Sequence, residues 1–119
     1  GGSNALNYYI GSTAIGKDLA KKIVASWNAT EIASLMSNCG EAGSKNLLKE
    51  IVKTKNVQLF KDTIAAYKEI ATDNPDKAEK YNLLIRHILE ANKEGSEPGF
   101  KGILKFANDN DIKLETIAV

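Results

Sequence analysis

Gly11, Gly16 and Lys17 are the first residues whose types and spacing match a chemical motif. Four residues separate the two glycines and a lysine follows the second, as in the loop that binds nucleotide phosphates. The preceding residues 6–10, LNYYI, can be read as the strand that such a loop follows. However, the loop needs a Ser or Thr hydroxyl after its lysine, and Asp18 would place a carboxylate among the phosphate oxygens. Because the later segments read as helices rather than alternating strands, the motif does not predict nucleotide binding.

Two further sets of residues have side chains of the types that bind calcium or act in nucleophilic catalysis. A calcium loop beginning at Asp109 fails, because Lys113 and Leu114 stand where an oxygen ligand and a glycine are required. Cys39 and His87 are the types that form a nucleophile and its base, but no catalytic signature surrounds either of them. We therefore predict no catalytic, cofactor-binding or metal-binding residue and no enzymatic activity. A Cys39 nucleophile remains the one enzymatic interpretation.

Length and composition indicate one ordinary globular domain. The chain has 119 residues, of which 43% are hydrophobic and 26% charged, and its net charge is +1. This near-neutral charge supplies no overall electric field to attract nucleic acid or an anionic membrane. Arg86 is the one arginine beside many lysines, which disfavours specific DNA recognition because arginine makes the two-pronged contacts to phosphates and bases. The single cysteine and the lack of a signal peptide favour the cytoplasm, or secretion from a bacterium by a route without a cleaved signal peptide. No apolar run is long enough to span a membrane.

The domain is expected to occupy residues 6–119. Residues 1–5, GGSNA, have the composition of an expression-tag remnant and are left out of the predicted domain. The frequent use of Lys, Asn and Ile is typical of an AT-rich coding sequence, which favours a bacterial source.

Apolar residues recur with helical spacing through most of the chain. The clearest helix start is Asn74, which is followed by Pro75 and Asp76. The helix that begins there runs to Gly95, and two apolar stripes along it predict that it is the central helix. Six helices are predicted, five of them capped by Thr13, Asn28, Ser44, Asn56 and Asn74, and the last carrying Phe100. Their inner faces include Leu19, Ile23, Ile32, Met36, Leu47, Ile51, Phe60, Tyr67, Tyr81, Ile88, Ile103 and Leu104.

These segments predict an all-α fold, a compact bundle of about six helices arranged as helical hairpins. Similar strings begin at Leu19, Leu47 and Leu84, so a short α-solenoid is the alternative. The conformations of residues 6–12 and 111–119 are left open. The second of these segments is compatible with a short strand, a helical turn or a docked coil.

The candidate binding residues lie outside the predicted core stripes. Tyr8 and Tyr9, followed by Ile10, precede the first helix, and aromatic residues in such a position are typical interface anchors. Packing of these residues across the open end of the bundle is the other interpretation. Leu83 and His87 belong, with Ala91, to a second stripe that suits either interior packing or a dimer seam. We therefore expect a non-catalytic protein–protein interaction module, such as a bacterial effector, adaptor or regulatory domain, with the partner and the choice between monomer and homodimer left open.

A DNA-binding regulator is the alternative function. Residues 30–53 have the outline of a helix, a turn and a second helix, although the turn predicted between them is too long for the known DNA-binding motif. The second of these helices offers Ser44, Lys45, Asn46 and Lys49, which have the chemistry to reach phosphates and one base. Since lysines on a helix usually form a solvated face, nucleic acid is the less favoured partner.

Overall fold

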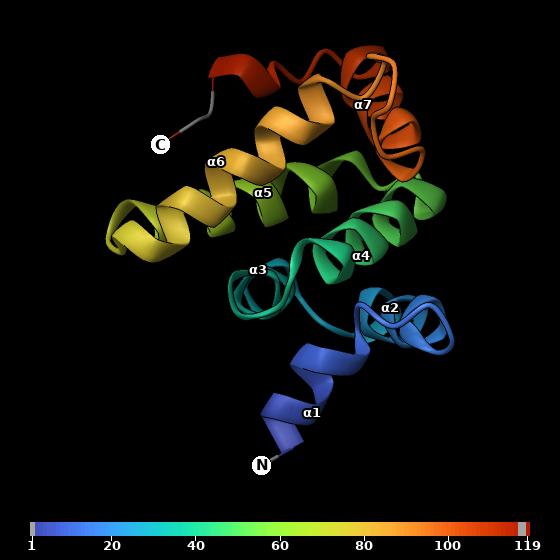
Figure 1. Ribbon diagram of the computed structural model, residues 1–119, viewed down its shortest axis with the longest axis vertical. Coiled ribbons are helices and arrows are strands. Elements are labelled where there is room, and N and C mark those ends of the chain that lie inside the picture. Colours follow the sequence, from blue (N-terminus) through green and yellow to red (C-terminus); the bar gives the residue numbers. More distant parts are fainter. Residues whose placement is uncertain (1, 117–118) are drawn as a thin grey trace.

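Helices make up most of the described chain, which comprises residues 2–116 and 119 of the computed structural model (Figure 1). Within these residues there is no strand, so the all-α prediction is confirmed and the interpretation of residues 6–10 as a strand is wrong. Residues up to Tyr9 are helical, and the amide of Ile10 still donates to the carbonyl of Leu6 at 3.0 Å. The described residues form seven α-helices, α1 (Gly2–Tyr9), α2 (Gly16–Ser26), α3 (Ala29–Asn38), α4 (Glu41–Thr54), α5 (Val57–Thr72), α6 (Pro75–Leu89) and α7 (Gly99–Asp109), and η1 (Leu114–Thr116) is a turn of 3₁₀ helix.

Asparagine caps define the starts of α3, α5 and α6, as the sequence predicts. Asn28 accepts from the Glu31 amide at 2.9 Å, and the Glu31 carboxylate accepts from the Asn28 amide at 3.0 Å, which completes a capping box. Asn56 accepts from the Leu59 amide at 3.0 Å. Asn74 accepts from the Asp76 amide at 3.2 Å, with Pro75 in the first turn of the helix.

Three other predicted helix boundaries are wrong. The first helix starts at Gly16 rather than after a Thr13 cap, because the Ser12 hydroxyl accepts from the Ala14 amide and closes a turn before it. Ser44 lies buried inside α4, where its hydroxyl donates to the carbonyl of Met36, and α4 starts at Glu41 instead. The helix predicted to run to Gly95 ends at Leu89, and Gly95 occupies a later turn with a φ of +82°.

The helices are stacked in three tiers, with α2 and α3 at one end, α4 and α5 in the middle, and α6 and α7 at the other end (Figure 1). The contacts between tiers are made by α2 with α4, α3 with α5, α4 with α7 and α5 with α6. Because α4 packs against α1, α2, α3, α5 and α7, the central helix is α4 and not the helix that begins at Asn74.

One hydrophobic core runs through these tiers. Its largest fully buried side chains include Tyr67, Tyr81, Phe60, Phe100 and Ile10. The radius of gyration is 13.1 Å and the dimensions are 37 × 30 × 29 Å, which are those of a compact bundle and not of an extended solenoid. Among the described residues, no helix has both the length and the apolar character needed to cross a membrane.

The C-terminal segment forms a helical turn that docks on the bundle. Leu114 of η1 is buried. Asn82 of α6 makes two hydrogen bonds with Val119, donating to its carbonyl at 2.8 Å and accepting from its amide at 2.8 Å. Of the three conformations left open for residues 111–119, the helical turn is the one observed, while residues 117 and 118 lie outside the described part of the chain.

Candidate partner-binding surface

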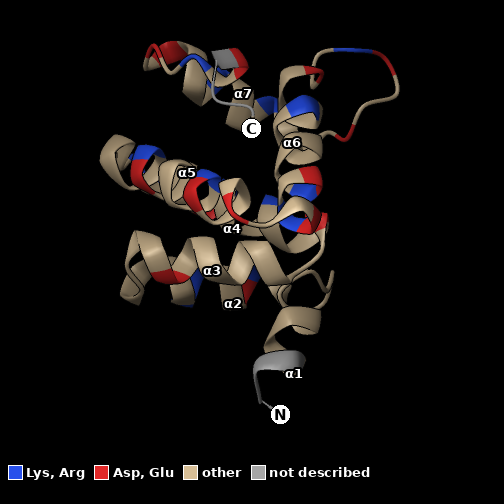
Figure 2. Ribbon diagram, turned by 90° about the vertical axis from the view of Figure 1, so that its left-hand side faces the viewer, with Lys and Arg blue, Asp and Glu red and all other residues tan. Residues whose placement is uncertain are grey.

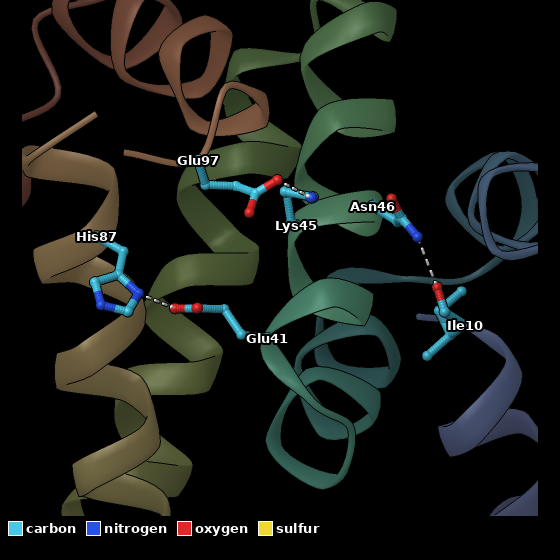
Figure 3. A network of polar contacts seen from close by, with 6 residues as sticks. All are labelled: Ile10, Glu41, Lys45, Asn46, His87 and Glu97. Atoms are coloured by element: carbon cyan, nitrogen blue, oxygen red, sulfur yellow. Dashed lines mark hydrogen bonds and ion pairs between the residues drawn. The ribbon is translucent and has the colours of Figure 1, made fainter. Parts of the chain in front are cut away.

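Helix α4 positions the candidate residues because its N-terminal half bonds to three other parts of the fold (Figure 3). Glu41 Oε1 lies 2.6 Å from His87 Nδ1 of α6. Lys45 Nζ lies 2.7 Å from Glu97 Oε1 in the segment that leads to α7. Asn46 Nδ2 donates to the carbonyl oxygen of Ile10 at 2.9 Å. The last of these bonds fixes the end of α1, which carries the two tyrosines.

Two glycines allow the segment after α1 to lie directly on α4. A Cβ atom on Gly43 would lie 2.7 Å from Ile10 Cγ2 and 2.9 Å from Cys39 Sγ. A Cβ atom on Gly16 would lie 2.5 Å from the Ile10 carbonyl oxygen. The Gly16 of the phosphate-loop motif is therefore a packing residue, because the protein's own backbone occupies the space beside it.

Only Cys39 and Gly40 separate α3 from α4, and two lysines of α6 hold this junction. Lys80 Nζ donates to the carbonyl oxygens of Ser37 at 3.1 Å and Cys39 at 2.7 Å. Lys77 Nζ donates to Asn38 Oδ1 at 2.7 Å. Positive charge at the C-terminus of α3 is favourable because the carbonyls there lack helical partners. These bonds tie α6 to the α3–α4 junction.

The two predicted tyrosines point outward from α1. The side chain of Tyr8 is 75% exposed and that of Tyr9 is 45% exposed, and their rings meet edge to face with centroids 5.1 Å apart. Ile10, in contrast, is fully buried. The interpretation that this segment packs across the end of the bundle is therefore correct for Ile10 and wrong for both tyrosines, since only one side of α1 faces the bundle.

Two hollows flank α1 and share Asn7 and Asn38. The first, of about 620 Å³, lies beside Tyr8 and reaches the α3–α4 junction at Gly40 and Ala42. The second, of about 590 Å³, lies between α1 and α3 and is lined by Leu6, Trp27, Thr30, Glu31, Ser34 and Leu35 in addition to the two asparagines. We call Tyr8, Tyr9 and these two hollows the tyrosine surface.

The tyrosine surface is almost uncharged. Among the residues that line either hollow, Glu31 is the only Asp, Glu, Lys, Arg or His, and it takes part in the capping box of α3. Figure 2 shows the described part of α1 without a charged residue, in contrast to α5 and α6, which carry both signs. Recognition here would therefore depend on aromatic packing and on amide and hydroxyl hydrogen bonds rather than on charge.

Leu83 and His87 lie one turn apart on α6, and the structure gives them different surroundings. Leu83 is 38% exposed, whereas the His87 ring bonds to Glu41 and lies with its centroid 6.4 Å from that of Phe100. Ala91, the third residue of the predicted stripe, is buried. Since Glu41 bonds to His87 while its neighbour Ala42 lines the hollow beside Tyr8, both predicted groups border the first turn of α4.

Cys39 has the surroundings of a structural thiol. It is 3% exposed, and its Sγ lies 3.8 Å from Ser44 Oγ and 3.7 Å from the carbonyl oxygen of Met36. Burial raises the pKa of the Cys39 thiol, which disfavours the thiolate that a nucleophile requires. His87 has Glu41 as its hydrogen-bonding partner, so the two residues of the hypothetical dyad are engaged with different groups.

The candidate DNA-reading side chains of α4 are mostly occupied inside the fold. The turn between α3 and α4 has two residues, so the prediction that it is too long is wrong, because α4 begins earlier than Ser44. However, Ser44 donates to Met36, Lys45 pairs with Glu97 and Asn46 donates to Ile10. These groups would have to leave their partners before they could contact a base or a phosphate.

Sequence reasoning missed Asn7, Asn38 and Trp27 as surface residues. Trp27 has the helical spacing of an inner residue and is half-buried against the core, but it is the C-cap of α2 and also lines the second hollow. The available signal was the polar and aromatic run NALNYY, which lacks the repeated aliphatic residues of a core helix.

Comparison with known proteins adds no relative to this description. No family model matches the chain, and no significant match is found among curated proteins or solved structures.

Within the described residues, no group of three or more histidine, cysteine, aspartate or glutamate side chains is placed to hold a metal ion.

Proposed function

We propose that this domain binds a protein partner through the tyrosine surface. The observation that carries the proposal is the 75% exposed Tyr8, which lines one of two adjoining hollows that have almost no charge. Tyrosine is enriched at the centres of protein interfaces because its ring supplies apolar contact area while its hydroxyl still forms a hydrogen bond. A partner side chain entering either hollow would cover Tyr8 or Leu6 and meet the side-chain amide of Asn7.

The surface is held in place before any partner arrives. Ile10 is fully buried, its carbonyl accepts from Asn46, and Gly43 lets it pack closely against α4. Ordering a loop or side chain on binding lowers affinity, so a helix already anchored at its C-terminal end favours tight association. His87 borders the other side of the α4 N-terminus, and it is proposed as a secondary contact together with Leu83, one turn away on α6.

Site-specific photo-crosslinking tests the proposal. A photoreactive phenylalanine analogue replaces Tyr8 in one variant and the exposed Glu69 of α5 in the control variant, and both are irradiated in lysate. We expect a discrete adduct from position 8 alone, which unlabelled protein displaces and a Tyr8→Ser/Tyr9→Ser protein does not. An adduct of twice the mass of the chain would identify a second copy as the partner. Equal adducts from both positions, or none from position 8, would refute a partner at this surface.

Duplex DNA is the competing partner. The occupied side chains of α4 argue against it, since three of its candidate contacts already have partners. A fluorescent duplex titrated with the protein would decide the matter, because binding through phosphates weakens steeply as salt rises.

A further inference from the structure

A groove between α4 and α7 lies outside the tyrosine surface. It is formed by two hollows of about 350 Å³ each, which share Val52 of α4 and Gly102 of α7. We call this the α4–α7 groove. Residues near Gly99 border one hollow and residues near Asp109 border the other, so the groove follows the length of α7. At 1.5 Å per residue, that length is about 15 Å.

The floor of the groove is apolar and open because glycine replaces larger side chains. Ile103 is buried, while Val52 and Phe106 are half-buried, and all three line the groove. A Cβ atom built on Gly102 would meet nothing within 4 Å. The missing side chain therefore leaves room for an apolar group from outside the chain.

The rim of the groove is positively charged. Its lining includes the four lysines Lys49, Lys53, Lys55 and Lys105 and one acidic residue, Asp109. The lining thus carries a net charge of +3 (four minus one), whereas the whole chain carries +1, so the remainder of the chain is negative overall. Positive charge is concentrated at this groove.

The neighbouring acids do not neutralise all of these lysines. Glu50 pairs with Lys53, and Asp109 pairs with Lys105. Glu97 pairs with Lys45 at 2.7 Å, and Lys49 interacts with Glu97 only by longer-range electrostatic attraction. Within the described residues, Lys49 and Lys55 therefore have no salt-bridge partner of their own, and one of them lies toward each end of the groove.

We infer that the α4–α7 groove binds a short acidic amphipathic helix of a partner protein. The apolar face of that helix covers Val52 and Phe106 and fills the open space at Gly102, and its carboxylates lie against Lys49 and Lys55. Helices that bind grooves in this way present apolar residues at every third or fourth position. Nucleic acid fits less well, because the floor is apolar and the protein's one arginine, Arg86, is not among the lining residues.

A displayed library of random 12-residue peptides is the direct probe. The folded protein is used for selection, and the selected peptides are measured by fluorescence anisotropy against three variants. Gly102→Leu fills the groove at a position where the structure has free space, so this variant is expected to stay folded. Lys49→Glu/Lys55→Glu reverses the charge of the rim. Lys22→Glu, at an exposed position of α2 that lines neither hollow, is the control for a change of charge.

We expect the selection to enrich peptides with glutamate or aspartate between apolar residues at helical spacing. Their affinity should fall at least tenfold in Gly102→Leu and in the double lysine variant, and stay within twofold in Lys22→Glu. Failure to enrich such peptides, or binding that Gly102→Leu leaves intact, would overturn the inference. Duplex DNA that competes with the selected peptides at physiological salt would overturn it too, in favour of nucleic acid. The groove and the tyrosine surface share no lining residue, so these results are independent of the crosslinking test.

Discussion

Replacing Gly16 by alanine should destabilise the fold, although alanine is the better helix former. Gly16 is the first residue of α2, and its added Cβ would lie 2.5 Å from the Ile10 carbonyl oxygen and 2.8 Å from Asn46 Nδ2. Real Cβ atoms essentially never approach other atoms within 3.0 Å, so the segment around Ile10 must move away from α2. That movement disturbs the hydrogen bond between Asn46 and Ile10 and the burial of the Ile10 side chain.

The size of the effect follows from these contacts. Overpacking in a well-packed site costs about 1–3 kcal/mol. A buried carbonyl that loses its hydrogen bond adds about 1–3 kcal/mol when no other donor replaces it. The helix preference of alanine over glycine returns at most about 1 kcal/mol. We therefore expect the free energy of unfolding to fall by about 1–5 kcal/mol, against the total of about 5–15 kcal/mol typical of a small domain.

Urea denaturation followed by circular dichroism measures this free energy. Gly102→Ala provides the matched control, because it is the same substitution in a helix at a position where the new Cβ meets nothing within 4 Å. That control should gain about 0.5–1 kcal/mol from helix preference alone. Opposite signs for the two substitutions would support the packing described here. If Gly16→Ala were as stable as Gly102→Ala, the close approach of Ile10 to α2 would be wrong.

Three further predictions concern buried and capping groups. Thr63 is fully buried, and its hydroxyl has no hydrogen-bond partner among the described residues, so Thr63→Val should raise the free energy of unfolding in urea by about 1 kcal/mol. A loss instead would mean that this hydroxyl has a partner. Asn28→Ala removes the α3 cap and should lower the same free energy by about 1 kcal/mol, and an unchanged value would contradict the capping box. Burial raises the pKa of Tyr67 to about 12, against about 10 in an unfolded chain, so the neutral phenol is favoured in the folded state. The stability that this shift provides is present below about pH 10 and is lost as the pH rises toward 12. Urea denaturation at several pH values should therefore show a smaller fall in the free energy of unfolding for Tyr67→Phe than for the parent protein over this pH range.

Local sequence signals predicted the parts of the fold that depend on nearby residues. The caps at Asn28, Asn56 and Asn74 are correct because each asparagine bonds to amides only two or three residues away. The apolar spacing likewise identified α5 and α7, whose predicted inner residues Phe60 and Ile103 are buried. Such interactions are complete within one turn of helix, so neighbouring residues are sufficient to specify them.

The errors arose where distant segments determine a residue's environment. Ser44 has the chemistry of a cap, but its hydroxyl donates a hydrogen bond to the carbonyl of Met36 in α3, and Gly40 is the N-cap residue before Glu41, the first residue of α4. The exposure of Tyr8 beside a buried Ile10 depends on how α1 meets α4, which no local pattern records. The α4–α7 groove was not predicted either, because its lysines and glycines come from helices separated by two others in the chain.

The sequence by itself determined that this chain forms amphipathic helices, where α3, α5 and α6 begin, and that no familiar catalytic motif is complete. Only the tertiary structure decided that α4 is the central helix, that two tyrosines face outward, and that surplus lysines line an apolar groove. The physical reason is that hydrogen bonding within a helix acts over three or four residues, whereas burial and surface charge depend on which helices pack together. Residues as far apart as Asn46 and Ile10 acquire their roles only when that packing is complete.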